Sequence, residues 1–294
     1  MLWAVFTLIA AAAQTARNAM QRELTVTLGT VGATHVRFLF GFPFALLFLA
    51  GVLIATGAGL PHPPPVFWPW VFAGAFTQIA ATATMLSVMG QRSFVVAYAY
   101  IKTEPVHVAL FGLIFLGDKI TPVAGIAILL ATAGVIVISL KGGANSEGSA
   151  RSTAIGLFSG ALFGLSAIGF RGAILSLNLP DFIVAATFTV TVGLVIQATV
   201  LSVYLLLRDR KVLQAIVRAW RPSLFAGFMG AFASEFWFLA FAITSAANVR
   251  TLALVEVLFA QGVTYFVFKQ PTTARESVGI VMVVIGVALL VWAH

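Results

Sequence analysis

The sequence contains no cysteine and few charged residues. Among its 294 residues there is no Cys, and Asp, Glu, Lys and Arg together make up only 9%. The lack of cysteine excludes a disulfide framework and a thiolate metal site, and the four histidines are scattered rather than clustered like metal ligands. The sequence also has no P-loop, so direct ATP drive by this chain alone is excluded. We therefore expect no metal and no cofactor.

Hydrophobic residues are abundant instead. They make up 61% of the chain, and its mean hydropathy is +1.05, which is typical of an integral membrane protein. We identify ten apolar segments, each about long enough to cross a bilayer as a helix. The predicted fold is an all-α membrane protein with ten transmembrane helices. The segments are 2–20, 31–57, 66–90, 94–116, 120–140, 153–176, 182–207, 222–245, 248–268 and 276–293.

The net charge of +8 is concentrated in alternate connections between these segments. Numbered in order, the odd connections hold almost all the basic residues, and the even ones hold essentially Lys119. The positive-inside rule predicts that the odd connections are cytoplasmic and that both termini lie on the outer face. This distribution indicates a lipid bilayer and not nucleic acid as the partner. The basic residues of the odd connections are Arg22, Arg92, Lys141, Arg151, Arg208, Arg210, Lys211, Arg218, Arg221, Lys269 and Arg275.

The seventh connection, RDRKVLQAIVRAWR at 208–221, has an amphipathic pattern. Its apolar residues recur at helical spacing, and its basic residues lie elsewhere on the turn. The pattern predicts either a helix that lies on anionic lipid or a basic connecting loop. The apolar residues are Val212, Leu213, Ile216, Val217 and Trp220.

The chain divides into two halves of five apolar segments each. A Gly- and Ser-rich linker, 142–152, separates a first half, 1–141, from a second half, 153–294. Because five is an odd number, a second copy must enter the membrane from the side opposite to the first. Inverted repeats of this kind are typical of secondary transporters, whose substrate sites lie near mid-membrane between the repeats. We expect the two halves to form one transport domain.

A weak sequence match in order supports this division. Shifting one half over the other by about 152 or 153 residues aligns identical residues at several points. These are FAG at 72–74 with FAG at 225–227, Leu86 with Leu239, Glu104 with Glu256, and Gly134 with Gly286.

Residues 102–137, KTEPVHVALFGLIFLGDKITPVAGIAILLATAGVIV, contain a Pro in one helix, an acidic residue after a small loop, and a Gly-rich late turn in the next helix. The pattern resembles the EamA-type, ten-helix branch of the drug/metabolite transporter superfamily, with Asp118 where the family usually has Glu. Residues 254–290 depart further, because they lack that Pro and have Gln270 at the acidic position. The resemblance is closest to YddG-type exporters of aromatic and other neutral amino acids. It implies two inverted five-helix repeats and such substrates.

Charged residues near the middle of the apolar segments are the main candidates for a substrate cavity. Each costs roughly 2.5–3.5 kcal/mol at a helix centre, which calls for a function or a partner. The alternative is that Lys102 pairs with Glu235 or Glu256 on another helix and only fastens the bundle. The candidates are Lys102, Glu104, His107, Glu235 and Glu256.

Spacing on the fourth segment separates these candidates. Glu104 and His107 are three residues apart and share a helix face, whereas Lys102 points largely away from Glu104. Pro105 frees a backbone carbonyl and predicts a bend beside the polar cluster.

Aromatic and neutral polar residues complete the predicted cavity. A pocket with charges of both signs and aromatic walls suits a zwitterion that carries an apolar side chain. The aromatic candidates are Tyr98, Tyr100 and Trp237. Interhelical hydrogen bonds would also explain the weaker neutral candidates, Gln14, Gln78, Thr82, Ser166 and Gln261. Nearer the segment ends, four arginines are expected to extend to the membrane interface: Arg17, Arg37, Arg171 and Arg250.

We therefore predict a secondary transporter that exports neutral, mainly aromatic or aliphatic, amino acids by alternating access, as a monomer in a bacterial inner membrane. A drug or metabolite exporter of the same fold is the alternative. Facilitated flow and proton coupling through buried carboxylates or His107 both stay open. An enzyme is not expected, because Glu104 and His107 form the only acid/base-like pair, without a Ser nucleophile or a metal site. A membrane scaffold would tolerate neutral residues at 104 and 256.

Overall fold

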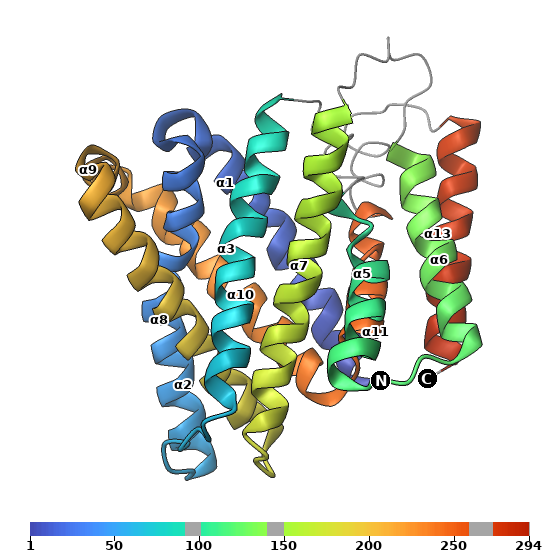
Figure 1. Ribbon diagram of the computed structural model, residues 1–294, viewed down its shortest axis with the longest axis horizontal. Helices are drawn as coiled ribbons and strands as arrows, with labels where there is room; N and C mark the ends of the chain where they lie inside the picture. The colour runs from blue at the N-terminus through green and yellow to red at the C-terminus, as the bar shows by residue number, and fades with distance from the viewer. Residues whose placement is uncertain (92–100, 140–149, 259–272, 294) are drawn as a thin grey trace.

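Helices run side by side in one bundle (Figure 1). The computed structural model describes residues 1–91, 101–139, 150–258 and 273–293. These ranges contain no strand, which confirms the all-α class. Within these ranges, five helical stretches are long and apolar enough to cross a membrane, and two shorter apolar helices accompany them, so the chain is an integral membrane protein. The count of ten helices stays a prediction, because parts of the fourth and ninth predicted spans fall outside the described residues.

The first half of the chain supplies α1 (Leu2–Leu39), α2 (Phe42–Thr56), α3 (Phe67–Gln91), α5 (Glu104–Phe111), which continues as the π-helix η1 (Gly112–Leu116), and α6 (Pro122–Ser139). The second half supplies α7 (Ala150–Ser176), α8 (Phe182–Arg208), α9 (Arg210–Arg218), α10 (Trp220–Ile243), α11 (Ala246–Leu252) and α13 (Ala274–Trp292). Figure 1 shows both termini at one end of the bundle and α9 at the other.

The boundary between the first two predicted spans is wrong. A break was expected over residues 21–30, but helical geometry continues from Leu2 to Leu39 with one non-helical residue, Gly29, at φ 66° and ψ 176°. Glycine adopts this conformation without the clash that a Cβ would cause, so one residue is enough to turn the chain. A second break lies inside the predicted span 31–57, at Phe40 and Gly41, just before Pro43. Proline lacks the N–H that a continuous helix would use there.

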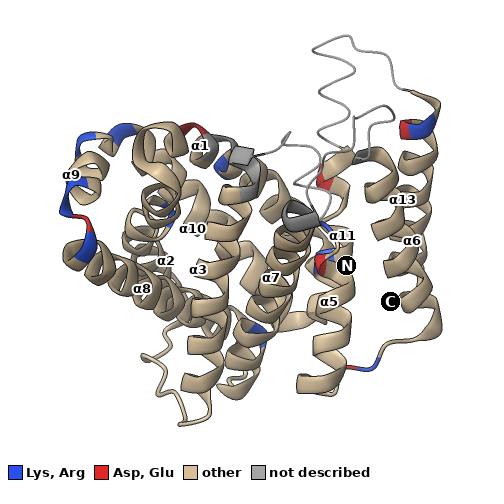
Figure 2. Ribbon diagram, turned by 45° about the horizontal axis from the view of Figure 1, so that its top comes forward, with Lys and Arg blue, Asp and Glu red and all other residues tan. Residues whose placement is uncertain are grey.

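The amphipathic pattern of the seventh connection forms helix α9, as one of the two sequence interpretations proposed. Asp209 caps it by accepting a hydrogen bond from the Lys211 backbone N–H. Ile216 is fully buried in a cluster with residues of α1 and α8, whereas Val217 is 66% exposed. The apolar face is therefore narrower than predicted and covers the bundle. Figure 2 shows basic residues concentrated around α9.

Small residues allow α6 and α13 to approach each other closely. A Cβ built on Gly134 would lie 2.7 Å from the carbonyl oxygen of Gly279, and one built on Gly286 would lie 2.9 Å from that of Ala127. Both distances are too short for a methyl group. The main helix pairs of the bundle are this pair, α3 with α7, and α1 with α10.

Replacing Gly134 by Ala is expected to lower stability by about 1–3 kcal/mol, since the added methyl forces α6 away from α13. Gly125→Ala on the same helix is the matched control, because its Cβ would have only one neighbour, at 4.0 Å. That change is expected to be neutral or stabilising, since Ala favours the helix. Thermal unfolding of the purified protein in detergent measures both. Equal melting temperatures for the two variants would contradict this account of the interface.

Candidate functional site

Two helices are interrupted beside the buried charges. The backbone turns at Lys102 and Thr103, between Ile101 and the start of α5 at Glu104, which is where a bend is predicted beside Pro105. A second break occurs at Ala253 and Leu254, shortly before Glu256, although no proline is present there. Interrupted helices expose backbone groups and polar side chains in the interior of a membrane protein, and many transporters bind their substrates at such points.

Two ion pairs join these interrupted helices. The Lys102 ammonium contacts the carboxylate of Glu256, and Arg250 Nε lies 3.0 Å from Glu104 Oε1. Each pair joins the α5 region to the α11 region, and all four side chains are buried. The pairing of Lys102 with Glu256 that the sequence offered as a structural alternative is therefore present. Figure 2 shows charged segments inside the bundle near α5 and α11.

A cavity lies beside the ion pairs, between the two halves of the chain. The space open to the centres of water molecules is about 30 Å³, room for on the order of two waters. An amino acid is larger, so the cavity must widen before it admits one. Its polar lining comes from α1, α3, the α5 region, α10 and α11, as Gln14, Arg17, Asn18, Arg37, Gln78, Lys102, Glu104, Ser234 and Arg250.

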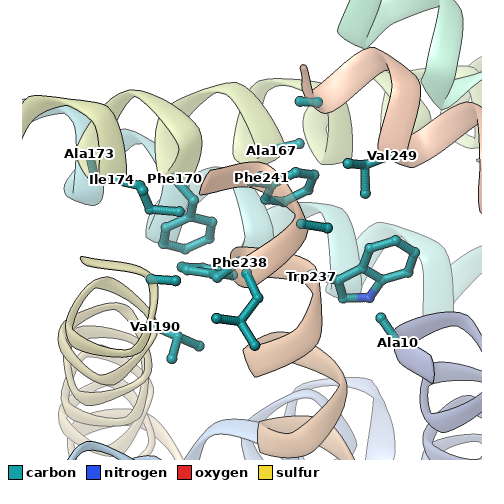
Figure 3. Close-up of a cluster of buried hydrophobic side chains, with 14 of the residues drawn as sticks. Ala10, Ala167, Phe170, Ala173, Ile174, Val190, Trp237, Phe238, Phe241 and Val249 are labelled. Carbon is teal, nitrogen blue, oxygen red and sulfur yellow. The ribbon is translucent and has the colours of Figure 1, made fainter. Parts of the chain in front are cut away.

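Aromatic side chains of α7 and α10 form another wall of the cavity. Phe170 and Phe238 have ring centroids 4.7 Å apart, and Phe241 lies beside them (Figure 3). The Trp237 Nε1–H donates to Gln14 Oε1 at 3.1 Å, which joins α10 to α1. The Arg250 guanidinium lies over the Trp237 ring, 4.4 Å from its centroid, in a cation–π arrangement. This wall therefore holds Arg250 and offers apolar surface next to it.

The arginines are where the structure departs most from the sequence interpretation. Arg17 and Arg37 are each 2% exposed and Arg250 is 8% exposed, and all three line the cavity rather than reach the interface. The reason for Arg17 is that its helix continues to Leu28 before the turn at Gly29, so Arg17 lies far from any helix end. Arg171 does lie near the end of α7, but Asp118 Oδ1 accepts from it at 3.2 Å.

The other predicted site residues divide between the cavity and its surroundings. Glu235 accepts a 2.5 Å hydrogen bond from Thr187 of α8 and lies outside the lining. Thr82 lies behind the lining and accepts a hydrogen bond from Arg37 Nη1 at 3.4 Å. His107 contacts the Thr103 carbonyl on its own helix and packs against Gly164 of α7.

Five predicted residues line the cavity: Gln14, Gln78, Lys102, Glu104 and Trp237. Ser166 is buried but does not line the cavity. Glu256 does not line the cavity either, but it contacts Lys102, which does. Tyr98, Tyr100 and Gln261 lie outside the described residues.

Known proteins share the fold of this chain. The model of the EamA-like transporter family matches residues 1–140, slightly less than half of the sequence. No curated protein matches the chain. Among 28 chains of solved structures that do match, one titled "Crystal structure of protein" is 14% identical, with a TM-score of 0.69. That alignment covers 98% of this chain and 96% of the other, so the fold extends over the whole length.

Proposed function

We propose that this chain is a secondary transporter of small organic molecules, with its substrate site in the central cavity. The observation that carries the proposal is a buried, charged cavity bounded by both halves and flanked by two interrupted helices. Ionisable side chains inside a membrane are costly and belong to functional sites by default. The family match over residues 1–140 supports the same class.

Alternating access is the proposed mechanism, and the helix pairing supports it. A shift of about 152 residues equates α1 with α7, α3 with α10 and α6 with α13. Under this shift, the contact between α1 and α10 corresponds to the contact between α7 and α3. The contact between α6 and α13 corresponds to itself. The approach of Gly134 to Gly279 likewise maps onto that of Gly286 to Ala127. This exchange is expected of inverted repeats that rock about a pseudo-two-fold axis.

The proposed substrates carry a carboxylate and an apolar body. Neutral amino acids, the class implied by the family resemblance, are the first candidates, since both arginines and aromatic rings line the cavity. Drugs or other metabolites are the alternative substrates. We further propose export across the bacterial inner membrane with the basic connections in the cytoplasm, in keeping with the charge bias.

Counterflow in proteoliposomes tests this function. Labelled phenylalanine, threonine and a lipophilic cation are offered without a pH gradient, and saturable flux of at least one is expected. Ala167→Leu adds bulk to the cavity wall on α7 and is expected to lower that flux about tenfold. Ala154→Leu, on the exposed face of the same helix, is the matched control. No saturable flux of any of the three, with or without a pH gradient, would overturn the proposal.

A further inference from the structure

The carboxylates at the cavity face cations of the protein, and the amide oxygens of its lining accept hydrogen bonds from other side chains. Glu104 faces Arg250, and Glu256 beneath the lining faces Lys102. The amide oxygens are engaged in the same way, by hydrogen bonds from other side chains. Gln14 Oε1 accepts from Trp237, Gln78 Oε1 from Gln197, and Asn18 Oδ1 from Arg17. An entering ammonium group would therefore meet carboxylates that already face a cation and amide oxygens that already accept a hydrogen bond.

Donor groups are in excess. Four basic side chains line the cavity against one carboxylate, Glu104, and Glu256 adds a second. Arg37 has no carboxylate partner in the described part of the chain. Its Nη1 reaches only the Thr82 hydroxyl at 3.4 Å, and its Nε has no hydrogen-bond partner among the described residues. A buried guanidinium with unused donors is costly unless an anion completes it.

Arg37 and Arg17 are held next to each other by α10. A Cβ built on Gly230 would lie 3.1 Å from Cγ of Arg37 and 3.4 Å from Cδ of Arg17. The absence of a side chain at 230 thus lets both arginine stems pass the helix at one point. Guanidinium groups are planar forks of donors that suit carboxylates. The arrangement brings two of them to the same part of the cavity.

We propose that the cavity selects organic anions, with the substrate carboxylate bound at Arg37 beside Arg17 and an apolar or aromatic body against Phe163, Phe170 and Phe238. The substrate class is then a carboxylate without a compensating ammonium group, such as a 2-oxo acid. An amino-acid zwitterion binds more weakly, because its ammonium group is placed among four cations, and the one carboxylate of the described lining, Glu104, already faces Arg250. This inference rests on the proposed function and places organic anions ahead of neutral amino acids among its substrates.

Phenylpyruvate and phenylalanine form the matched pair for the test, since they share ring and carboxylate and differ at the carbon that bears the amino group. Purified full-length protein is assayed by counterflow in proteoliposomes and, separately, by thermal stabilisation in detergent. The half-saturating concentration of phenylpyruvate is expected to be at least about tenfold below that of phenylalanine, as for a charged hydrogen bond gained. Phenylalanine equal to or better than phenylpyruvate in both assays would overturn the anion proposal.

Variants of Arg37 then test whether this residue binds the substrate carboxylate. Arg37→Gln is expected to raise the half-saturating concentration of phenylpyruvate at least about tenfold while changing that of phenylalanine less, so the selectivity itself falls. Arg37→Lys retains the charge but not the planar pair of donors. Its half-saturating concentration for phenylpyruvate should lie between that of the unmodified protein and that of Arg37→Gln. Arg218→Gln, on the exposed side of α9, is the control. Unchanged selectivity in a folded Arg37→Gln or Arg37→Lys protein would remove Arg37 from the site.

The two assays separate the two proposals. Stabilisation by phenylpyruvate without flux of any compound would leave the anion site standing and overturn transport. Flux of phenylalanine without stabilisation or flux by phenylpyruvate would leave transport standing and overturn the anion site.

Discussion

Glu256→Gln is expected to abolish transport and to destabilise the folded protein. The substitution removes the carboxylate that the buried Lys102 ammonium contacts. Removing one partner of a buried ion pair costs about 3–5 kcal/mol, because the remaining charge keeps its desolvation penalty. A loss of this size lowers the folding equilibrium constant by more than about one hundredfold. Counterflow and thermal unfolding of the purified variant measure the two losses.

A double variant tests whether the Lys102–Glu256 pair only stabilises the helix bundle or also takes part in transport. Lys102→Leu with Glu256→Leu removes both charges, and replacing a buried ion pair by apolar residues is often neutral or stabilising. The melting temperature is therefore expected to return to that of the unmodified protein, while transport stays lost because the cavity lining lacks the Lys102 ammonium. A stable double variant that transports normally would assign the pair to fastening alone.

Much of the fold follows from hydropathy and from proline. Long apolar runs predict helices wherever they occur, and Pro105 predicts the break at Lys102 and Thr103 because a missing N–H is a local property. The equivalent break at Ala253 and Leu254 has no such residue nearby, so the local sequence does not predict it. Gly29 is similar: one residue replaces a predicted ten-residue connection, and nothing in its flanking sequence marks it as a turn.

The site was harder to predict because it depends on helix rotation. A helix that is apolar all round gives no signal of which face meets the cavity. Arg17 illustrates the difficulty, since misplacing one helix end by several residues converts a buried residue into an apparent interface residue. Glu104 and His107 show the same difficulty in a second way. They are near neighbours on one helix, yet Glu104 lines the cavity and His107 packs against Gly164.

The contact between His107 of α5 and Gly164 of α7 allows an engineered disulfide, which is expected to block transport reversibly. A Cβ built on Gly164 would lie 3.2 Å from Cβ of His107. Disulfides need about 3.5–4.5 Å between Cβ atoms, so a small adjustment lets His107→Cys and Gly164→Cys cross-link. The native chain has no cysteine, so no other thiol competes. The bond would tie α5 of the first half to α7 of the second.

If the halves rock against each other, the oxidised double variant is expected to lose nearly all flux and to recover it on reduction. Each single variant, treated with the same oxidant and reductant, shows what the substitution and the reagents do without a cross-link. Gel mobility or mass spectrometry establishes how much of the protein carries the disulfide. A fully cross-linked protein that transports at the reduced rate would show that α5 and α7 move as one body, and the moving boundary would then have to pass elsewhere in the bundle.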